Sequence, residues 1–290
     1  MRATLPVIIL PLLVNSARAQ VWVQEKRYHN HLEAEGLKGP VRSMTEIQYK
    51  WMMPNGDSGR PRISYTKLYR YNRTGNLEAE RLIRIDGSTG HLDSFLYDAR
   101  GRLQQRIGME PTRAGSKVAT LYFYDASGNL AREVATMREQ VLLSTSTYQY
   151  DARGRRTERV RESVHRRETE RIAYTYDARG RKLTERTSGV PQTTLRTFSY
   201  PAPGTVKTHY LYERPAKPGD RIEADAFERR DEDGRLLQQE YDHKAAEPHC
   251  IYSYRVDASG NWTTRYVADE RQPGKRYVLQ ERHIEYERQR

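Results

Sequence analysis

The stretch Tyr150-Asp151-Ala152-Arg153-Gly154-Arg155 recurs, with small changes, along nearly the whole chain. Aligned on their glycines, successive copies lie 24 to 30 residues apart, and most lie 26 or 27 apart. Asp or Asn stands three residues before seven of the eight glycines, and Tyr stands one residue earlier in six copies. A fixed period of this size indicates a repeat architecture. The aligned glycines are Gly75, Gly101, Gly128, Gly154, Gly180, Gly204, Gly234 and Gly260.

The shared motif, Y-[DN]-x-x-G, predicts a tight turn. Asp or Asn at the first position of a type I turn bonds its own backbone two residues on, and Gly at the fourth position takes the left-handed conformation. Such a turn joins hairpin strands with a bulge. We therefore expect structural turns at Asn72, Gly75, Asp98, Gly101, Asp125, Gly128, Asp151, Gly154, Asp177, Gly180, Asp231, Gly234, Asp257 and Gly260.

The residues that flank the turns alternate as strand residues do. Aromatic side chains two residues apart precede the turns, as in Tyr148 with Tyr150 and Tyr174 with Tyr176, and residues two apart on a strand share a face. Two strands and two connections fill each period. The predicted fold class is all-β, a long antiparallel up-and-down meander of about 16–18 strands from ~26-residue repeats, twisted or curled rather than flat.

These residues resemble the YD-repeat, or Rhs-repeat, family over roughly residues 65–265. Members of that family form long antiparallel sheets that spiral, in large proteins, into a hollow shell around a toxic C-terminal domain. The resemblance implies a short, Rhs-like open shell here. The chain is far shorter than those members, and Tyr277–Arg290 is Arg-rich and strand-like, with no proline-glycine-rich cleavage motif. We therefore expect a secreted member without a C-terminal toxin domain.

Three segments are expected along the chain. Residues 1–19 combine a charged start, a ten-residue apolar core and an Ala-x-Ala end, which is typical of a signal peptide cleaved after Ala19. Residues 20–38 are irregular, with one short helix over Leu32–Leu37, and residues 39–290 form a single YD-repeat β-sheet domain whose first strand is its opening edge. The expected location is secreted or periplasmic.

The charge favours anionic partners. The chain has a net charge of +12, and removal of Arg2 and Arg18 with the signal peptide lowers it to +10. A basic balance suits nucleic acid, acidic polysaccharide or lipid headgroups. Because a secreted protein rarely meets nucleic acid, acidic envelope glycans or a protein partner are the expected ligands. No transmembrane helix is expected, since ten apolar residues cannot span a bilayer.

No catalytic, cofactor or metal constellation stands out. Asp231-Glu232-Asp233-Gly234 begins like a calcium loop, but the turn motif already explains Asp231 and Gly234. The eight histidines are scattered, with only His243 and His249 in weak ligand spacing. Cys250, the only cysteine, cannot form an internal disulfide and is expected to be a half-buried strand residue or, alternatively, to link two chains.

Two regions are candidates for binding. The connections at the end of the sheet opposite the Y-[DN]-x-x-G turns vary in sequence, and function often resides on varied loops set on a rigid frame. The densest basic run offers Arg155, Arg156, Arg166 and Arg167 for binding an anion or a glycan. The alternative for this run is cross-strand ion pairing, because four glutamates are threaded through it.

The expected function is a secreted or envelope-associated scaffold that binds glycans or a protein partner. The alternatives are a component of an Rhs-type toxin-delivery or contact-dependent system, an outer-membrane β-barrel, and an enzyme acting on envelope polysaccharide. A membrane barrel needs a continuous apolar band, whereas only 36% of the residues are hydrophobic and the mean hydropathy is −0.94. One apolar sheet face needs cover, either because the sheet curls on itself or because two chains form a homo-oligomer.

Overall fold

The computed structural model describes residues 30–50, 62–110, 117–138, 141–189, 193–213, 221–242, 250–269 and 277–287. The expected signal peptide and its cleavage site lie outside these residues. The described part contains one short helix and eighteen strands. In chain order they are α2 (His31–Ala34), β1 (Val41–Lys50), β2 (Arg62–Tyr71), β3 (Leu77–Arg84), β4 (Thr89–Tyr97), β5 (Leu103–Met109), β6 (Val118–Tyr124), β7 (Leu130–Met137), β8 (Val141–Tyr150), β9 (Arg156–Ser163), β10 (Glu168–Tyr176), β11 (Lys182–Ser188), β12 (Thr193–Ser199), β13 (Thr205–Glu213), β14 (Arg221–Arg230), β15 (Leu236–Asp242), β16 (Cys250–Val256), β17 (Trp262–Asp269) and β18 (Tyr277–Tyr286).

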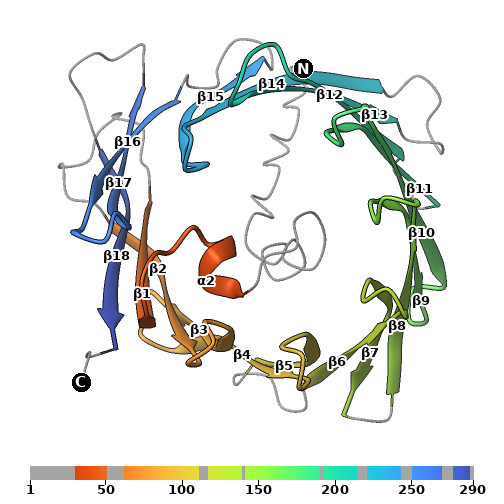
Figure 1. The fold of residues 1–290 in the computed structure, drawn as a ribbon, viewed down its shortest axis with the longest axis horizontal. Helices are drawn as coiled ribbons and strands as arrows, with labels where there is room; N and C mark the ends of the chain where they lie inside the picture. The colour runs from red at the N-terminus through yellow and green to blue at the C-terminus, as the bar shows by residue number, and fades with distance from the viewer. Residues whose placement is uncertain are drawn as a thin grey trace, which may run out of the picture.

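Strand β1 joins the two ends of the sheet into a closed barrel (Figure 1). Every strand pairs antiparallel with its neighbours in sequence, and β1 pairs with both β2 and β18. The all-β meander is confirmed. The open shell, with β1 as a free edge, is wrong, because pairing of β1 with β18 satisfies the backbone groups that two free edges would leave unpaired.

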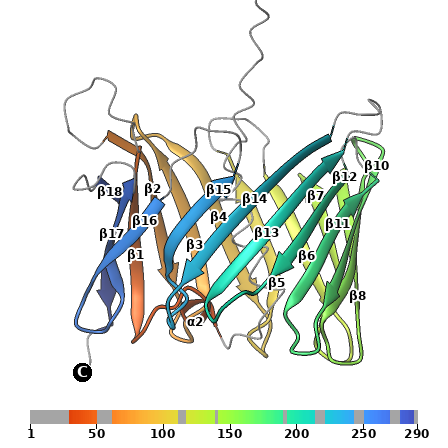
Figure 2. The same ribbon diagram turned by 90° about the horizontal axis from the view of Figure 1, so that it is seen from above.

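The Y-[DN]-x-x-G turns all lie at one end of the barrel, which we call the regular rim; the other end is the varied rim (Figure 2). At the β8–β9 turn, the Asp151 carboxylate accepts hydrogen bonds from the backbone N–H groups of Arg153 (2.9 Å) and Arg155 (3.0 Å). Gly154 has a φ of 73°, and the ladder shifts register between Gln149 and Tyr150, which is the bulge that such a turn requires. The remaining seven aligned glycines also have positive φ.

Alternate side chains along each strand point into the barrel. Helix α2 lies inside the barrel (Figure 1). Leu32 and Leu37, on either side of the helix end, pack with buried inward-facing rings that include Tyr69, Phe95 and Tyr122. The helix is one turn long and shorter than the predicted Leu32–Leu37. Its position is held by the Leu32 N–H, which donates to the Gly75 carbonyl at 3.0 Å.

The segment from residue 206 to residue 240 is more regular than its prolines suggest. The sequence predicts a bend or an edge there because proline cannot donate a ladder hydrogen bond. Instead, β13 and β14 pair over nine residue pairs, from Thr205–Arg229 to Glu213–Arg221. Pro201 and Pro203 precede β13 in the turn, where no ladder bond is needed, and the other two prolines lie outside the described residues.

The turn geometry predicts unequal costs for two neighbouring substitutions. Gly154→Val places a β-branched residue in left-handed backbone and should lower the free energy of unfolding by about 2 kcal/mol or more. Ala152→Val, in the exposed part of the same turn, should change it by no more than about 0.5 kcal/mol. Urea denaturation of the two variants measures both values, and equal losses of stability would contradict the turn assignment.

Candidate functional site on the inner wall

On the inner wall, the tyrosine of the Y-[DN]-x-x-G motif forms a hydrogen bond with the preceding repeat. The Tyr97 hydroxyl donates to the Leu77 carbonyl at 2.7 Å. Leu77 is the first residue of β3, the strand that follows the preceding turn. Burial raises the pKa of Tyr97 and Tyr124, so these hydroxyls remain protonated donors. The same bond recurs from Tyr124 to Leu103 (2.8 Å), Tyr150 to Leu130 (2.9 Å), Tyr176 to Arg156 (2.7 Å), Tyr200 to Lys182 (2.8 Å) and Tyr254 to Leu236 (2.7 Å).

An arginine directly after the turn glycine adds a second link. Arg155 donates through Nε to Asp151 Oδ2 at 2.6 Å, while its guanidinium lies 5.0 Å from the ring centre of Tyr176 in the next repeat. Arg102 and Arg181 repeat this arrangement, over Tyr124 at 4.6 Å and over Tyr200 at 4.3 Å, with Asp98 and Asp177 as their ion-pair partners. Arg155 therefore has a structural partner on both sides.

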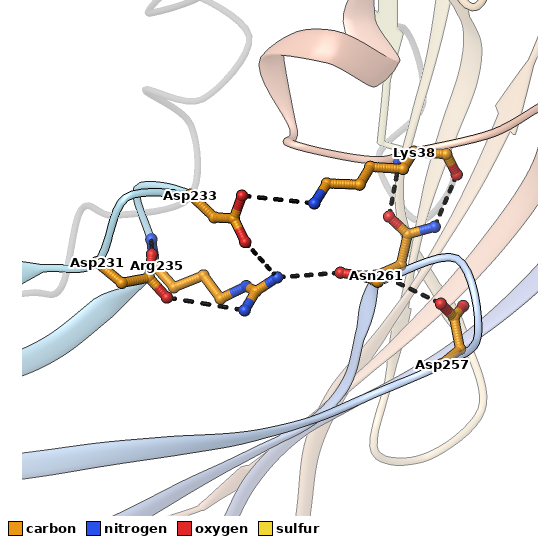
Figure 3. Close-up of polar contacts among 7 residues, drawn as sticks. Lys38, Asp231, Asp233, Arg235, Asp257 and Asn261 are labelled. Carbon is orange, nitrogen blue, oxygen red and sulfur yellow. Dashed lines mark hydrogen bonds and ion pairs between the residues drawn. The ribbon is translucent and has the colours of Figure 1, made fainter.

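Near the β1–β18 junction, an asparagine takes the place of this arginine (Figure 3). Asn261 is 1% exposed, and its side-chain amide makes two bonds with one backbone unit: Oδ1 accepts from the Lys38 N–H at 2.6 Å and Nδ2 donates to the Lys38 carbonyl at 2.8 Å. Nδ2 also lies 2.7 Å from the hydroxyl of Tyr286, on the last strand. One buried side chain thus connects the segment before β1 to the end of β18.

The carboxylates of the acidic turn at Asp231 form ion pairs with basic side chains of the same chain (Figure 3). Arg235 lies 3.7 Å from Asp231 and 2.8 Å from Asp233, and it donates to the Gly260 carbonyl at 3.0 Å. Lys38 Nζ lies 3.4 Å from Asp233. Arg235, held by these carboxylates, links the β14–β15 turn to the β16–β17 turn. Among the described residues, no group of three or more side chains is placed to hold a metal ion.

The inner wall near α2 is packed and charge-balanced. Glu46 and Arg282 are 1% and 3% exposed in their side chains, and Arg282 donates both to Glu46 (3.0 Å) and to Glu35 after α2 (3.3 Å). Lys67 and Glu80 form a further pair at 2.5 Å. Buried charges of this kind are stable only in pairs. This half of the wall is therefore core.

Asp93 anchors a third buried cluster on the same half. Arg106 donates to both of its carboxylate oxygens, at 2.8 and 2.9 Å, and His91 Nε2 lies 3.0 Å away. Burial acts to raise the pKa of Asp93, but the bonds to His91 and Arg106 outweigh burial, so its pKa lies below the usual value. The hydrogen bond to Asp93 raises the pKa of His91.

The inner wall of β10–β13 is different, because charged and aromatic side chains there are only partly buried. Glu185 lies 3.2 Å from Lys182 and 2.9 Å from Arg196, and the Arg196 side chain is 42% exposed. The rings of Tyr210 and Tyr212 stack at 6.0 Å with an interplanar angle of 4°. We call this surface the inner platform; it comprises Tyr174, Lys182, Glu185, Arg196, Phe198, Tyr210 and Tyr212.

The four arginines predicted to bind an anion do not come together. Arg155 is paired at the regular rim, as described above. Arg156 is 3% exposed, with its guanidinium 4.7 Å from the ring centre of Tyr148, so it is part of the wall's core. Arg166 and Arg167 are exposed in the β9–β10 connection at the varied rim. Adjacent residues such as Arg155 and Arg156 have separate surroundings because successive side chains point in different directions.

The inner platform was not predicted. Tyr210 and Tyr212 do show the two-residue spacing of inward-facing aromatics, but no Y-[DN]-x-x-G turn follows them. The pairing of Arg196 with Glu185 depends on the β11–β12 register, in which these residues lie opposite each other. Cys250, expected to be a half-buried strand residue, is buried at the start of β16, where it packs with Tyr252 and Val267.

No family model and no curated protein matches the chain. The solved structures that are similar to it include two porin-like proteins and a holotoxin pore. A porin-like protein from Bacteroides uniformis has 12% identity and a TM-score of 0.44 over 86% of this chain and 99% of that one. A porin-like protein from Bacteroides vulgatus has 10% identity and a TM-score of 0.36 over 85% and 98%. The Tc holotoxin pore of Photorhabdus luminescens has 13% identity and a TM-score of 0.35 over 80% of this chain and 14% of that one. Likenesses this weak carry no argument about function.

The Asp93 cluster predicts a pH-dependent loss of stability. Asp93→Asn removes the counter-charge of Arg106 and should lower the free energy of unfolding at pH 7 by about 3 kcal/mol. A lowered Asp pKa gives stability that is present above the unfolded value of about 3.9 and is lost as pH falls through the folded-state pKa. The raised pKa of His91 adds stability that is lost as pH rises through that pKa.

The difference between wild type and Asp93→Asn should therefore be largest near pH 5 to 6, measured by urea denaturation across pH. It should shrink on both sides of that range. The exposed Glu232→Gln is the control and should show no such profile. A difference that does not vary with pH would contradict the ionised cluster.

Proposed function

We propose that this chain is an envelope-associated or secreted barrel that is surrounded by water and binds an acidic glycan on the inner platform. The observation that carries the proposal is the half-exposed arrangement of Arg196, Tyr210 and Tyr212 on one stretch of the inner wall. A guanidinium binds a carboxylate through two hydrogen bonds. Tyrosine offers an apolar ring and a polar hydroxyl, which suits the mixed surface of a sugar.

Further cations lie next to the platform. Arg161 on β9 faces inward, since it is opposite the buried, inward-facing Ser146, and it is exposed. Arg159, two residues away on the same face, lies 4.0 Å from Glu170. A chain of acidic sugars following the inner wall from β9 to β13 would meet Arg161 on β9 and Arg196 on β12. An extended anionic ligand fits the spacing better than a small anion does.

The outer face of β9–β14 supports a barrel surrounded by water. Lys207 and His209 lie 2.9 and 2.8 Å from Asp225 on this face. Arg171 and Glu158 form another outer pair, at 2.5 Å. A charged Arg or Lys facing lipid costs about 2–4 kcal/mol at the bilayer midplane. Water solvates these pairs without that penalty.

An outer-membrane β-barrel is the second candidate. The closed antiparallel barrel favours it, and so do the exposed apolar side chains on the outer face of β4–β6, which are Leu96, Met109, Leu121 and Phe123. Within the described ranges, no helix is long and apolar enough to cross a membrane. A chain that stays in solution only in detergent would favour this candidate. A role in toxin delivery rests on the repeat resemblance alone.

Glycan binding is tested with a panel of acidic and neutral envelope polysaccharides at low and at physiological salt. We expect selective binding of acidic glycans that survives physiological salt. Arg196→Gln should weaken it roughly tenfold or more, because a hydrogen bond to a charged group contributes about 1.5–3 kcal/mol. Arg186→Gln, at an exposed position on the outer face of the neighbouring strand, is the matched control and should bind as wild type does.

Binding that is equal for every polyanion and vanishes with salt would contradict the proposal, since it would reflect the net charge alone. Equal weakening by Arg196→Gln and Arg186→Gln would place the ligand elsewhere. Both variants are checked for an unchanged unfolding midpoint.

A further inference from the structure

One stretch of the varied rim combines exposed apolar side chains with exposed arginines. Val141 and Val164 are 51% and 53% exposed, and Leu142, next to Val141 on β8, is 42% exposed. Three exposed arginines flank these side chains in the β7–β8 and β9–β10 connections. We call this stretch the apolar-basic rim; it consists of Arg138, Val141, Leu142, Val164, Arg166 and Arg167.

The two connections that form it lie side by side. The Val164 N–H donates to the Leu143 carbonyl at 2.9 Å, directly beyond the last β8–β9 pair, which is Ser144 with Ser163. On the other side, the Arg138 N–H donates to the Lys117 carbonyl at 3.1 Å. Apolar and basic residues from both connections therefore belong to one continuous surface.

Two of the arginines sit in strained backbone. Arg138 and Arg167 have φ values of 52° and 53°, and they are the two non-glycine residues with positive φ in the described part of the chain. Left-handed backbone costs a non-glycine residue roughly 1 kcal/mol or more. Arg138 directly follows β7, and Arg167 lies in the connection between β9 and β10.

The arginines of this surface differ from the arginines that directly follow the turn glycines at the regular rim. Arg102, Arg155 and Arg181 at the regular rim each have an Asp partner. Across the described ranges, Arg138, Arg166 and Arg167 form no ion pair. Exposed apolar tips surrounded by unpaired cations complement a surface that is both anionic and apolar below its headgroups.

We propose that the apolar-basic rim docks the barrel on an anionic lipid surface. The valine and leucine tips enter the headgroup region, and the three arginines meet phosphate groups. A second copy of this chain is a poorer occupant, because it would bring like charges together. The docking is peripheral and leaves the charged outer face of β9–β14 in water, so it is independent of glycan binding on the inner platform.

Vesicle co-sedimentation of the purified chain, without glycan, tests the proposal. Vesicles of phosphatidylcholine with phosphatidylglycerol should bind the chain, and vesicles of phosphatidylcholine alone should bind it much more weakly. Arg166→Gln with Arg167→Gln should weaken binding roughly thirtyfold, because each basic residue near an anionic membrane contributes about a fivefold factor. Val141→Asp with Val164→Asp should weaken it at least about tenfold.

The regular rim supplies matched controls. Leu96 and Val256 are 51% and 50% exposed, so Leu96→Asp with Val256→Asp repeats the apolar-to-acid change at the other end of the barrel. Arg100 and Arg179 are exposed turn residues there, and Arg100→Gln with Arg179→Gln repeats the loss of charge. Both control pairs should bind vesicles as wild type does.

Three results would overturn the proposal: equal binding to both kinds of vesicle, equal losses in the rim and control variants, or no binding at all. A dimer in vesicle-free solution that Val141→Asp with Val164→Asp converts to a monomer would show that the surface joins two copies instead. Binding that resists high salt and ignores the arginine changes would indicate insertion of the barrel. None of these results depends on whether the inner platform binds a glycan.

Discussion

The hydrogen bond from a motif tyrosine to a carbonyl of the preceding repeat is the interaction on which the barrel depends. A two-stranded repeat cannot bury its own aromatic face, so each repeat is stable only against its neighbours. A single bond of this kind contributes about 1 kcal/mol. Six of them, from Tyr97 to Tyr254, follow the inner wall and fix the spacing of successive hairpins. The arginines after the turns strengthen the same contacts through an Asp on one side and a tyrosine ring on the other.

Closure uses the same rim but different residues. Contacts between successive repeats join residues that are close in the sequence. The first and last strands, in contrast, pair although they lie at opposite ends of the sheet in the sequence. Asn261 and Tyr286 hold the two ends of the barrel together at the regular rim. Both the oxygen and the nitrogen of the buried Asn261 side-chain amide form hydrogen bonds there. The closed wall then has two unlike halves on its inside. One half is filled by α2 and paired charges, and the β10–β13 half keeps its charges only partly buried, which is why it is the candidate binding surface.

The sequence predicted what is local. The type I turn, its left-handed glycine and the alternation of Tyr148 with Tyr150 depend on neighbouring residues, and the strand count followed from the period. The closed barrel depends on a ladder between β1 and β18, about 240 residues apart, for which no local pattern exists. The surroundings of the candidate arginines could not be predicted from the sequence for a similar reason. Arg155, Arg156 and Arg166 look alike in sequence, but their burial depends on strand parity and on which rim their turn occupies.

Disulfide trapping across the β1–β18 pair tests closure most directly. Thr45 and His283 lie opposite each other on the outer face of this pair, so Thr45→Cys with His283→Cys, in a Cys250→Ser chain, should form an intramolecular disulfide in the oxidised monomer. Thr45→Cys with Thr175→Cys, on strands that do not pair, should remain reduced. Non-reducing gels and peptide mapping measure both. A Thr45–His283 variant that stays reduced, or links only between chains, would contradict the closed barrel.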